Sequence, residues 1–202
     1  MFMRDIFRLP VLLMRTLAGA ILIVLSLSCA RLMHSSAGTP NDIQYAQQLW
    51  LHLEQEQMVG SHAKALIPFI GAARPHGWVL EVESRMLQVG DHSGFVVVKK
   101  NYRGDQLSVA DVEKERAKYL DSISVMFQRE NGYDTDNKNW FWVQYQPDGQ
   151  LSTMRKMGMK IAMAGKLIKA ASPDKNRACI YCHSSAGGGD YIFYPDIVLP
   201  PN

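Results

Sequence analysis

The sequence has only three cysteines among its 202 residues, and this scarcity excludes a fold built on disulfides. Cys179 and Cys182 are separated by two residues, so a disulfide between them would close a tiny loop and remove little entropy from the unfolded chain. Cys29 lies apart from them, inside an apolar N-terminal segment. The cysteines therefore indicate a chemical role rather than a structural framework.

Excess charge and internal repetition are also missing. The formal net charge is only +3, part of it in the N-terminal segment, which is too little to indicate a nucleic-acid partner. The chain has no repeat, no low-complexity tract and no strong linker. Its 47% apolar and 20% charged content is ordinary for a globular protein. We expect a single domain over residues 38–202.

No hydrophobic run is long enough for an ordinary membrane span. The apolar stretch 17–30 is shorter than the roughly 20 residues that a spanning helix needs. Arginines precede this stretch and small residues follow it, which is typical of a secretory signal peptide. We expect residues 1–30 to be such a leader, cleaved after Ala30 or after Ala37, in an exported protein. The alternative is an uncleaved membrane anchor, and only then would the chain meet a membrane.

Hydrophobic periodicity predicts two helices and several strands. Capping residues open a helix over 39–56, and its apolar residues recur at helical spacing: Ile43, Ala46, Leu49 and Leu53. A second helix is expected over 151–170, ending before the Ser-Pro pair at 172–173. Strands are expected over four segments: 78–84, 94–102, 122–130 and 139–145.

The strands and their connections predict an antiparallel sheet. Segment 78–84 alternates, as in a half-buried strand, whereas 94–102 is almost continuously apolar and should be covered on both faces. The polar segments 131–138 and 147–150 have the composition of hairpin connections. The charged insert 103–122 suggests a solvated hairpin or helix, without assigned chemistry. The predicted fold class is α+β, an antiparallel sheet with flanking helices and the cysteines in a C-terminal tail.

The tail carries the motif Cys-Ile-Tyr-Cys-His over 179–183. Two cysteines three positions apart on a helical turn point the same way, so their thiols can add to the two vinyl groups of one haem. The histidine that follows can then ligate the iron. Cys-x-x-Cys-His is the signature of haem c attachment, with Cys179 and Cys182 holding the porphyrin and His183 as the proximal iron ligand.

Three other uses of the motif compete with haem attachment. A thioredoxin-like dithiol normally follows a strand early in a βαβ unit, not the end of an antiparallel pattern. A zinc site needs two more soft ligands at short spacing, and the chain has no second such cluster. Coincidence is improbable because the mature chain uses its cysteines only here. Haem c is the preferred interpretation.

The C-terminal place of the motif bears on the second iron ligand. The residues after His183 include neither Met nor His, so a sixth ligand must come from upstream. A methionine group is one source, although core packing explains it better: Met154, Met157, Met159 and Met163. The other candidates are histidines in polar surroundings, which favour surface positions: His52, His62 and His92. We therefore expect an iron with one open face, accessible to a substrate or a gas.

Beyond the motif, the chain resembles the cytochrome P-460 family, which includes the cytochromes c′-beta, from about residue 75 to 193. The resemblance rests on the order and spacing of six segments: PHGWVLEVES, GFVVVKKNY, SVMFQRENGYD, NWFWVQYQPDG, ACIYCH and GDYIF. It implies a small periplasmic protein, often a homodimer, with an antiparallel sheet flanked by helices.

The resemblance also implies a covalent bond between a strand lysine and the haem edge, as in cytochromes P-460 proper. Lys99 falls on the cross-linking position. Strand alternation places Lys99 on one face and Lys100 on the other, so Lys100 serves as a control. From the pattern alone, snorkelling to solvent is the better explanation for either lysine.

The family's catalytic members oxidise hydroxylamine, whereas its c′-beta members bind nitric oxide or carbon monoxide. We therefore expect oxidation of hydroxylamine or a similar small nitrogen compound, with electrons passing to a soluble cytochrome. Gas binding and simple electron transfer remain the alternatives. Distal or proton-transfer candidates are Arg74, His76 and Asp174, each equally well explained by a turn or capping role. Four further residues either line the pocket or belong to the core: Phe95, Met126, Trp140 and Trp142.

Overall fold

The computed structural model describes residues 37–71, 77–156, 158–166 and 179–193, and all of them belong to one compact unit. The expected leader, residues 1–30, lies outside the described residues. No helix in the described ranges combines the length and the apolar character needed to cross a membrane. Whether the leader is cleaved stays a prediction.

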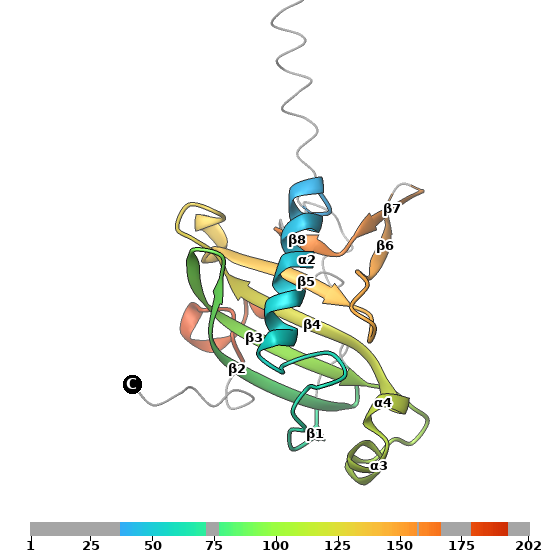
Figure 1. The fold of residues 1–202 in the computed structure, drawn as a ribbon. Coiled ribbons are helices and arrows are strands. Elements are labelled where there is room, and N and C mark those ends of the chain that lie inside the picture. The colour runs from blue at the N-terminus through green and yellow to red at the C-terminus, as the bar shows by residue number, and fades with distance from the viewer. Residues whose placement is uncertain (1–36, 72–76, 157, 167–178, 194–202) are drawn as a thin grey trace, which may run out of the picture. The chain divides into compact units, whose positions relative to one another are not determined.

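A six-stranded antiparallel sheet forms the centre of the domain (Figure 1). Its strand order is β1-β2-β3-β4-β5-β8, and every neighbouring pair is antiparallel. The bounds are β1 Phe69–Ile70, β2 Val79–Val89, β3 His92–Tyr102, β4 Leu120–Gln128, β5 Trp140–Tyr145 and β8 Ala164–Gly165. This arrangement confirms the predicted α+β class with an antiparallel sheet.

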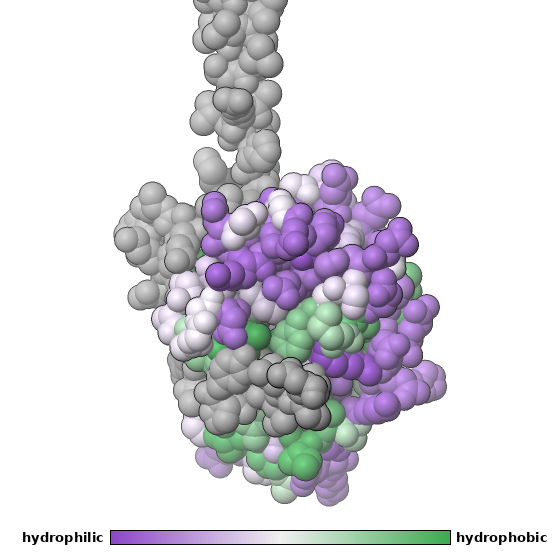
Figure 2. All heavy atoms as spheres, turned by 90° about the vertical axis from the view of Figure 1, so that its left-hand side faces the viewer, coloured by the Kyte–Doolittle hydropathy of each residue, from purple (hydrophilic) through white to green (hydrophobic). Residues whose placement is uncertain are grey.

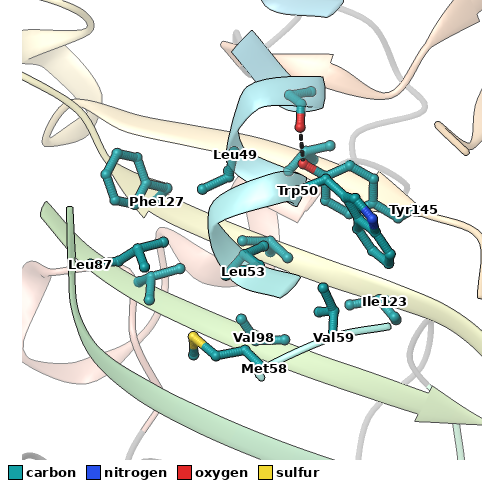
Figure 3. Packing of buried hydrophobic residues seen from close by; sticks show 14 of the residues in the cluster. Leu49, Trp50, Leu53, Met58, Val59, Leu87, Val98, Ile123, Phe127 and Tyr145 are labelled. Atoms are coloured by element: carbon teal, nitrogen blue, oxygen red, sulfur yellow. Dashed lines mark hydrogen bonds between the residues drawn. The ribbon is translucent and has the colours of Figure 1, made fainter. Parts of the chain in front are cut away.

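Helix α2, Pro40–Gln55, covers one face of the sheet (Figure 3). It begins at a capping box in which Thr39 and Asp42 satisfy each other's backbone N–H groups. Leu49 and Leu53, fully buried, pack onto the strands, and the Tyr145 hydroxyl donates to the Ala46 carbonyl at 2.7 Å. The helix predicted over 39–56 is therefore confirmed.

The central strand β3 is covered on both faces, as its sequence predicts. Val96 and Val98 belong to the cluster under α2, whereas Val97 packs in a second cluster on the opposite face. We call this opposite face the α5 face, after the helix α5, Cys179–His183, that packs on it. Because residues alternate along a strand, β3 contributes to two different cores.

The helix predicted over 151–170 is wrong. Strand β6, Thr153–Lys156, pairs antiparallel with β7, Met159–Ala162, and residues 164–165 form β8. Gly158, between these two strands, has φ +81°, a left-handed conformation that interrupts a helix. Met154 and Met159 are exposed, so core packing does not explain them either. Met157 lies outside the described residues.

The charged insert 103–122 contains two short helices, α3, Val109–Lys114, and α4, Arg116–Tyr119. The helical alternative for this segment is confirmed, but the insert is not fully solvated. Val112 is fully buried in a small cluster with Val79 of β2 and Tyr102 of β3. The insert therefore packs against the end of the β2–β3 hairpin.

Candidate functional site

The α5 face of the sheet has an apolar centre and a polar end. Cross-strand pairs share a face, so the pairs Val97–Met126 and Met126–Trp142 form one row across β3, β4 and β5. The next row along the strands is polar, because Lys99 pairs with Ser124 and Ser124 with Gln144. A group bound on this face would meet both kinds of surface.

The cysteine motif forms α5, which packs on the apolar row. Ile180 is fully buried against Val97, Met126, Trp140 and Trp142. Burial of this side chain contributes to holding the helix on the sheet. Cys179 is partly buried and Cys182 is exposed, and the two are free thiols. Burial raises the pKa of the Cys179 thiol, which keeps that thiol protonated at neutral pH.

His183 is held by a hydrogen bond that it donates to the segment downstream of α5. Its Nδ1 lies 2.7 Å from the carbonyl oxygen of Tyr191. A carbonyl only accepts, so Nδ1 carries the proton and donates, and the neutral ring keeps a lone pair on Nε2. The ring lies edge-to-face on Trp142, with centroids 5.1 Å apart, and on Phe193 at 5.4 Å. The imidazole is thus fixed in both orientation and tautomer.

The charge state of His183 follows from its surroundings. Burial lowers the pKa of the imidazole, and the hydrogen bond to Tyr191 opposes this effect only in part. The positive charge of Lys99 lowers the pKa further. His183 is therefore neutral at physiological pH, which is the state that binds a metal ion through nitrogen.

Lys99 and Lys100 lie on opposite faces of β3, as strand alternation predicts. Lys99 is partly exposed on the α5 face, where its charge acts on His183. Lys100 is 4% exposed on the α2 side, with its Nζ 3.8 Å from a carboxylate oxygen of the fully buried Glu81. Only Lys99 therefore shares a face with the motif.

A cavity of about 350 Å³ opens beside the site, at the end of the sheet away from Lys99. Apolar rings and polar side chains line it together: Phe95, Gln128, Lys138, Trp140, Asp190 and Ile192. The indole N–H of Trp140 donates to the Asp190 carbonyl at 2.9 Å, which ties the segment after α5 to β5.

Figure 2, which views the molecule from the left-hand side of Figure 1, shows apolar residues gathered in the lower part of that surface and hydrophilic ones in the upper part.

Comparison with known protein families shows which family the chain belongs to. A family model described as Cytochrome P460 matches residues 85–194, which is more than half of the chain. The chain belongs to the cytochrome P460 family. It is therefore a haem-binding cytochrome, and the matched segment includes β3, β5 and α5. No curated protein and no solved structure matches the chain.

The residues of the α5 face fit the haem that a cytochrome P460 binds. His183 presents an unprotonated nitrogen that can ligate iron, and Trp142 and Phe193 place aromatic rings beside it. Two buried polar atoms on this face, the Trp142 Nε1 and the Ser84 Oγ, find no partner among the described residues. Buried polar groups are normally paired, so this face is suited to receive a further group.

The structure brings together part of the predicted site. Met126, Trp140, Trp142 and Phe95 lie in or against the cluster that holds Ile180 of the motif. Of the other histidines, His92 packs edge-to-face on Phe127 of the α2-side cluster, and His62 is exposed. The candidates Arg74, His76 and Asp174 lie outside the described residues. No group of three or more His, Cys, Asp or Glu that could hold a metal ion occurs in the described part of the chain.

Sequence reasoning missed two features of the site. The first is the Tyr191 carbonyl, because a backbone acceptor has no sequence signature. The second is a buried polar cluster on the α5 face. The Asn101 amide donates to the Ser122 carbonyl at 3.2 Å and to the Ser124 hydroxyl at 3.1 Å, and the Gln144 amide donates to the Ser122 hydroxyl at 3.2 Å. Alternation of polar residues on neighbouring strands was the only signal for it.

Proposed function

We propose that this cytochrome is an exported mono-haem c protein that oxidises hydroxylamine or a similar small nitrogen compound at an iron with an open distal face. The observation that carries the proposal is the hydrogen bond from His183 Nδ1 to the Tyr191 carbonyl. A histidine that ligates a metal usually donates its other ring N–H to such an acceptor, because this hydrogen bond fixes the tautomer and makes Nε2 a stronger ligand.

Covalent attachment through Cys179 and Cys182 is the second part of the proposal. Each thiol would add across one vinyl double bond of the porphyrin, with its sulfur bonding to one carbon and its hydrogen going to the other, so that nothing leaves. Both cysteines are free, and α5 places them on one short helix beside His183. The mono-haem assignment is supported by the single motif in the chain.

An open distal face is supported by the positions of the alternative ligands. Met154 and Met159 are exposed on the β6–β7 hairpin. On the α2 side, His92 packs on Phe127, and its Nε2–H donates to the Gln128 carbonyl at 2.9 Å. Haem iron supplies, when bound, a coordination position and a redox couple for a small nitrogen compound. In this proposal His183 holds the proximal side, and Trp142 and Phe193 shield its ring from water.

Lys99 is proposed to form the additional bond to the haem edge. It lies on the α5 face close enough for its charge to act on His183. Proton transfer during oxidation is proposed for Arg74, His76 or Asp174. The released electrons pass to a soluble electron-transfer cytochrome, and the active form is proposed to be a homodimer in the periplasm.

One optical spectrum of the reduced protein, followed by a hydroxylamine assay, tests the function. A Soret band shifted far to the red together with hydroxylamine-dependent reduction of an acceptor cytochrome is the expected result. An ordinary high-spin c-type band that changes only on adding nitric oxide would instead establish a gas-binding protein of the c′-beta type. A low-spin spectrum with a sharp alpha band would establish a simple electron carrier.

A further inference from the structure

Two neighbouring tryptophans on β5 differ in how their indole N–H groups are paired. Trp140 and Trp142 are two residues apart, so both lie on the α5 face, and they are 2% and 5% exposed. The Trp140 Nε1 donates to the Asp190 carbonyl at 2.9 Å. The Trp142 Nε1 is buried and meets no acceptor among the described residues.

The neighbours of Trp142 do not supply an acceptor. The His183 ring, 5.1 Å away between centroids, uses Nδ1 as a donor to Tyr191 and presents Nε2 for iron. The Tyr191 carbonyl accepts from His183 but lies outside hydrogen-bond reach of the Trp142 Nε1, and the other side chains of the cluster around Ile180 are largely apolar. A buried donor left unpaired costs its full desolvation free energy, so the geometry indicates that the acceptor belongs to a bound group.

The chemistry of haem restricts what that acceptor can be. The ring nitrogens bind iron, and the periphery carries apolar substituents and the propionate carboxylates. A propionate is therefore the only strong acceptor that the porphyrin offers to a peripheral N–H. We propose that the Trp142 Nε1–H donates a hydrogen bond to a haem propionate. This inference rests on the proposed function only in taking His183 as the iron ligand.

The hydrogen bond makes Trp142 a positioning residue with an electrostatic effect. It holds the carboxylate edge of the porphyrin against β5 and offsets part of the propionate's negative charge. Charged residues on or beside this face include Lys99 on β3, Asp190 after α5 and Lys138 before β5. Without the donor, the less screened negative charge favours the ferric state, and the midpoint potential falls.

The test compares Trp142→Phe with Trp140→Phe in the haem-loaded protein. Trp140→Phe is a matched control, because it removes an indole on the same strand and face whose N–H is already paired by the protein. With 13C-labelled haem propionates, infrared difference spectra at fixed pH should show a carboxylate band shift in Trp142→Phe only. The midpoint potential should fall in the same variant only. Equal shifts in both variants, or none in Trp142→Phe, would overturn the proposal.

A measurement on the unmutated protein covers the case in which Trp142→Phe does not fold. In 15N-labelled, ferrous, carbon monoxide-bound protein, the Trp142 indole proton should resonate downfield and exchange slowly, as expected of a charge-assisted hydrogen bond. A resonance at the position of a free indole would refute the bond. Haem retention after denaturation is scored separately, so a failure of covalent attachment is distinguishable from a failure of this hydrogen bond.

Discussion

Glu81 is the residue whose removal should cost this domain most among its charged side chains. It is fully buried on β2, and three groups surround its carboxylate. Arg116 Nε lies 2.7 Å from one oxygen, and the Tyr102 hydroxyl donates to the other at 2.8 Å. Lys100 Nζ lies 3.8 Å away, with only 5% of its side chain exposed. Glu81→Ala removes the carboxylate that acts most strongly on the buried Lys100 ammonium and leaves Glu83 as the remaining one.

The expected loss of stability follows from this geometry. Breaking a buried ion pair by removing one partner costs about 3–5 kcal/mol in free energy of unfolding, because an uncompensated charge stays inside. Lys100 keeps one hydrogen bond, to the Lys64 carbonyl at 3.2 Å, which cannot neutralise it. The matched control is Glu56→Gln, whose ion pair with Arg85 is 51% and 35% exposed and should contribute about 0–1 kcal/mol.

Denaturant unfolding of the haem-loaded variants, followed by circular dichroism, measures both losses. The double variant Glu81→Leu/Lys100→Met should recover most of the stability, since it removes both buried charges together. A loss below about 1 kcal/mol for Glu81→Ala, or no recovery in the double variant, would refute the reasoning. The result also bears on the site, because Glu81 and Lys100 are cross-strand partners beside the Val82–Lys99 pair.

Three further predictions concern single side chains. Burial raises the pKa of Glu83 above its ordinary 4.5, so the folded state loses stability as pH rises from that value through the raised pKa. Glu83→Gln should therefore melt at a higher temperature than the unmutated protein at neutral pH and at the same temperature at about pH 4. Lys99→Ala should move the reduced Soret band to an ordinary c-type position, whereas Lys100→Met should not, because Lys100 lies on the other face; equal spectra for both variants would contradict the cross-link. Tyr145→Phe removes a fully buried hydroxyl that donates to Ala46 and should cost about 1 kcal/mol in unfolding free energy, and an unchanged denaturation midpoint would count against that bond's contribution.

The fold was predictable where local chemistry and tertiary packing agree. The capping box at Thr39 and the apolar spacing that follows it identify α2, and the β-branched run in β3 identifies a strand covered on both faces. Over 151–170, methionine and lysine spacing suggested a helix. A turn around Gly158 and pairing between β6 and β7 decided otherwise, and pairing partners cannot be read from one segment alone.

The sequence predicted the alternation of side chains along β2 but did not predict that a carboxylate on its polar side is buried. Val79, Glu81 and Glu83 share a face, and the pattern suggested a half-buried strand. Glu81 is instead fully buried, because Arg116 from the insert closes over it and pairs with it. Burial of a carboxylate depends on a partner that lies 35 residues further along the chain, and alternation carries no information about such a partner.

In the candidate site, too, features set by the local sequence were predictable and features set by tertiary packing were not. The motif over 179–183 is local, so its residues and spacing were predictable, and alternation correctly placed Lys99 and Lys100 on opposite faces. The acceptor for His183 is a backbone carbonyl eight residues away, and the orphaned N–H of Trp142 emerges only when β5 and α5 pack together. Both features depend on the tertiary structure.

Covalent attachment of haem through Cys179 and Cys182 is the central claim of this account. Intact-mass measurement of the denatured protein, produced with a c-type maturation system, tests it most directly. The account predicts one haem mass added to the chain after denaturation, and loss of that addition in the double variant Cys179→Ser/Cys182→Ser. Haem that separates from the unmutated chain on denaturation would contradict the claim.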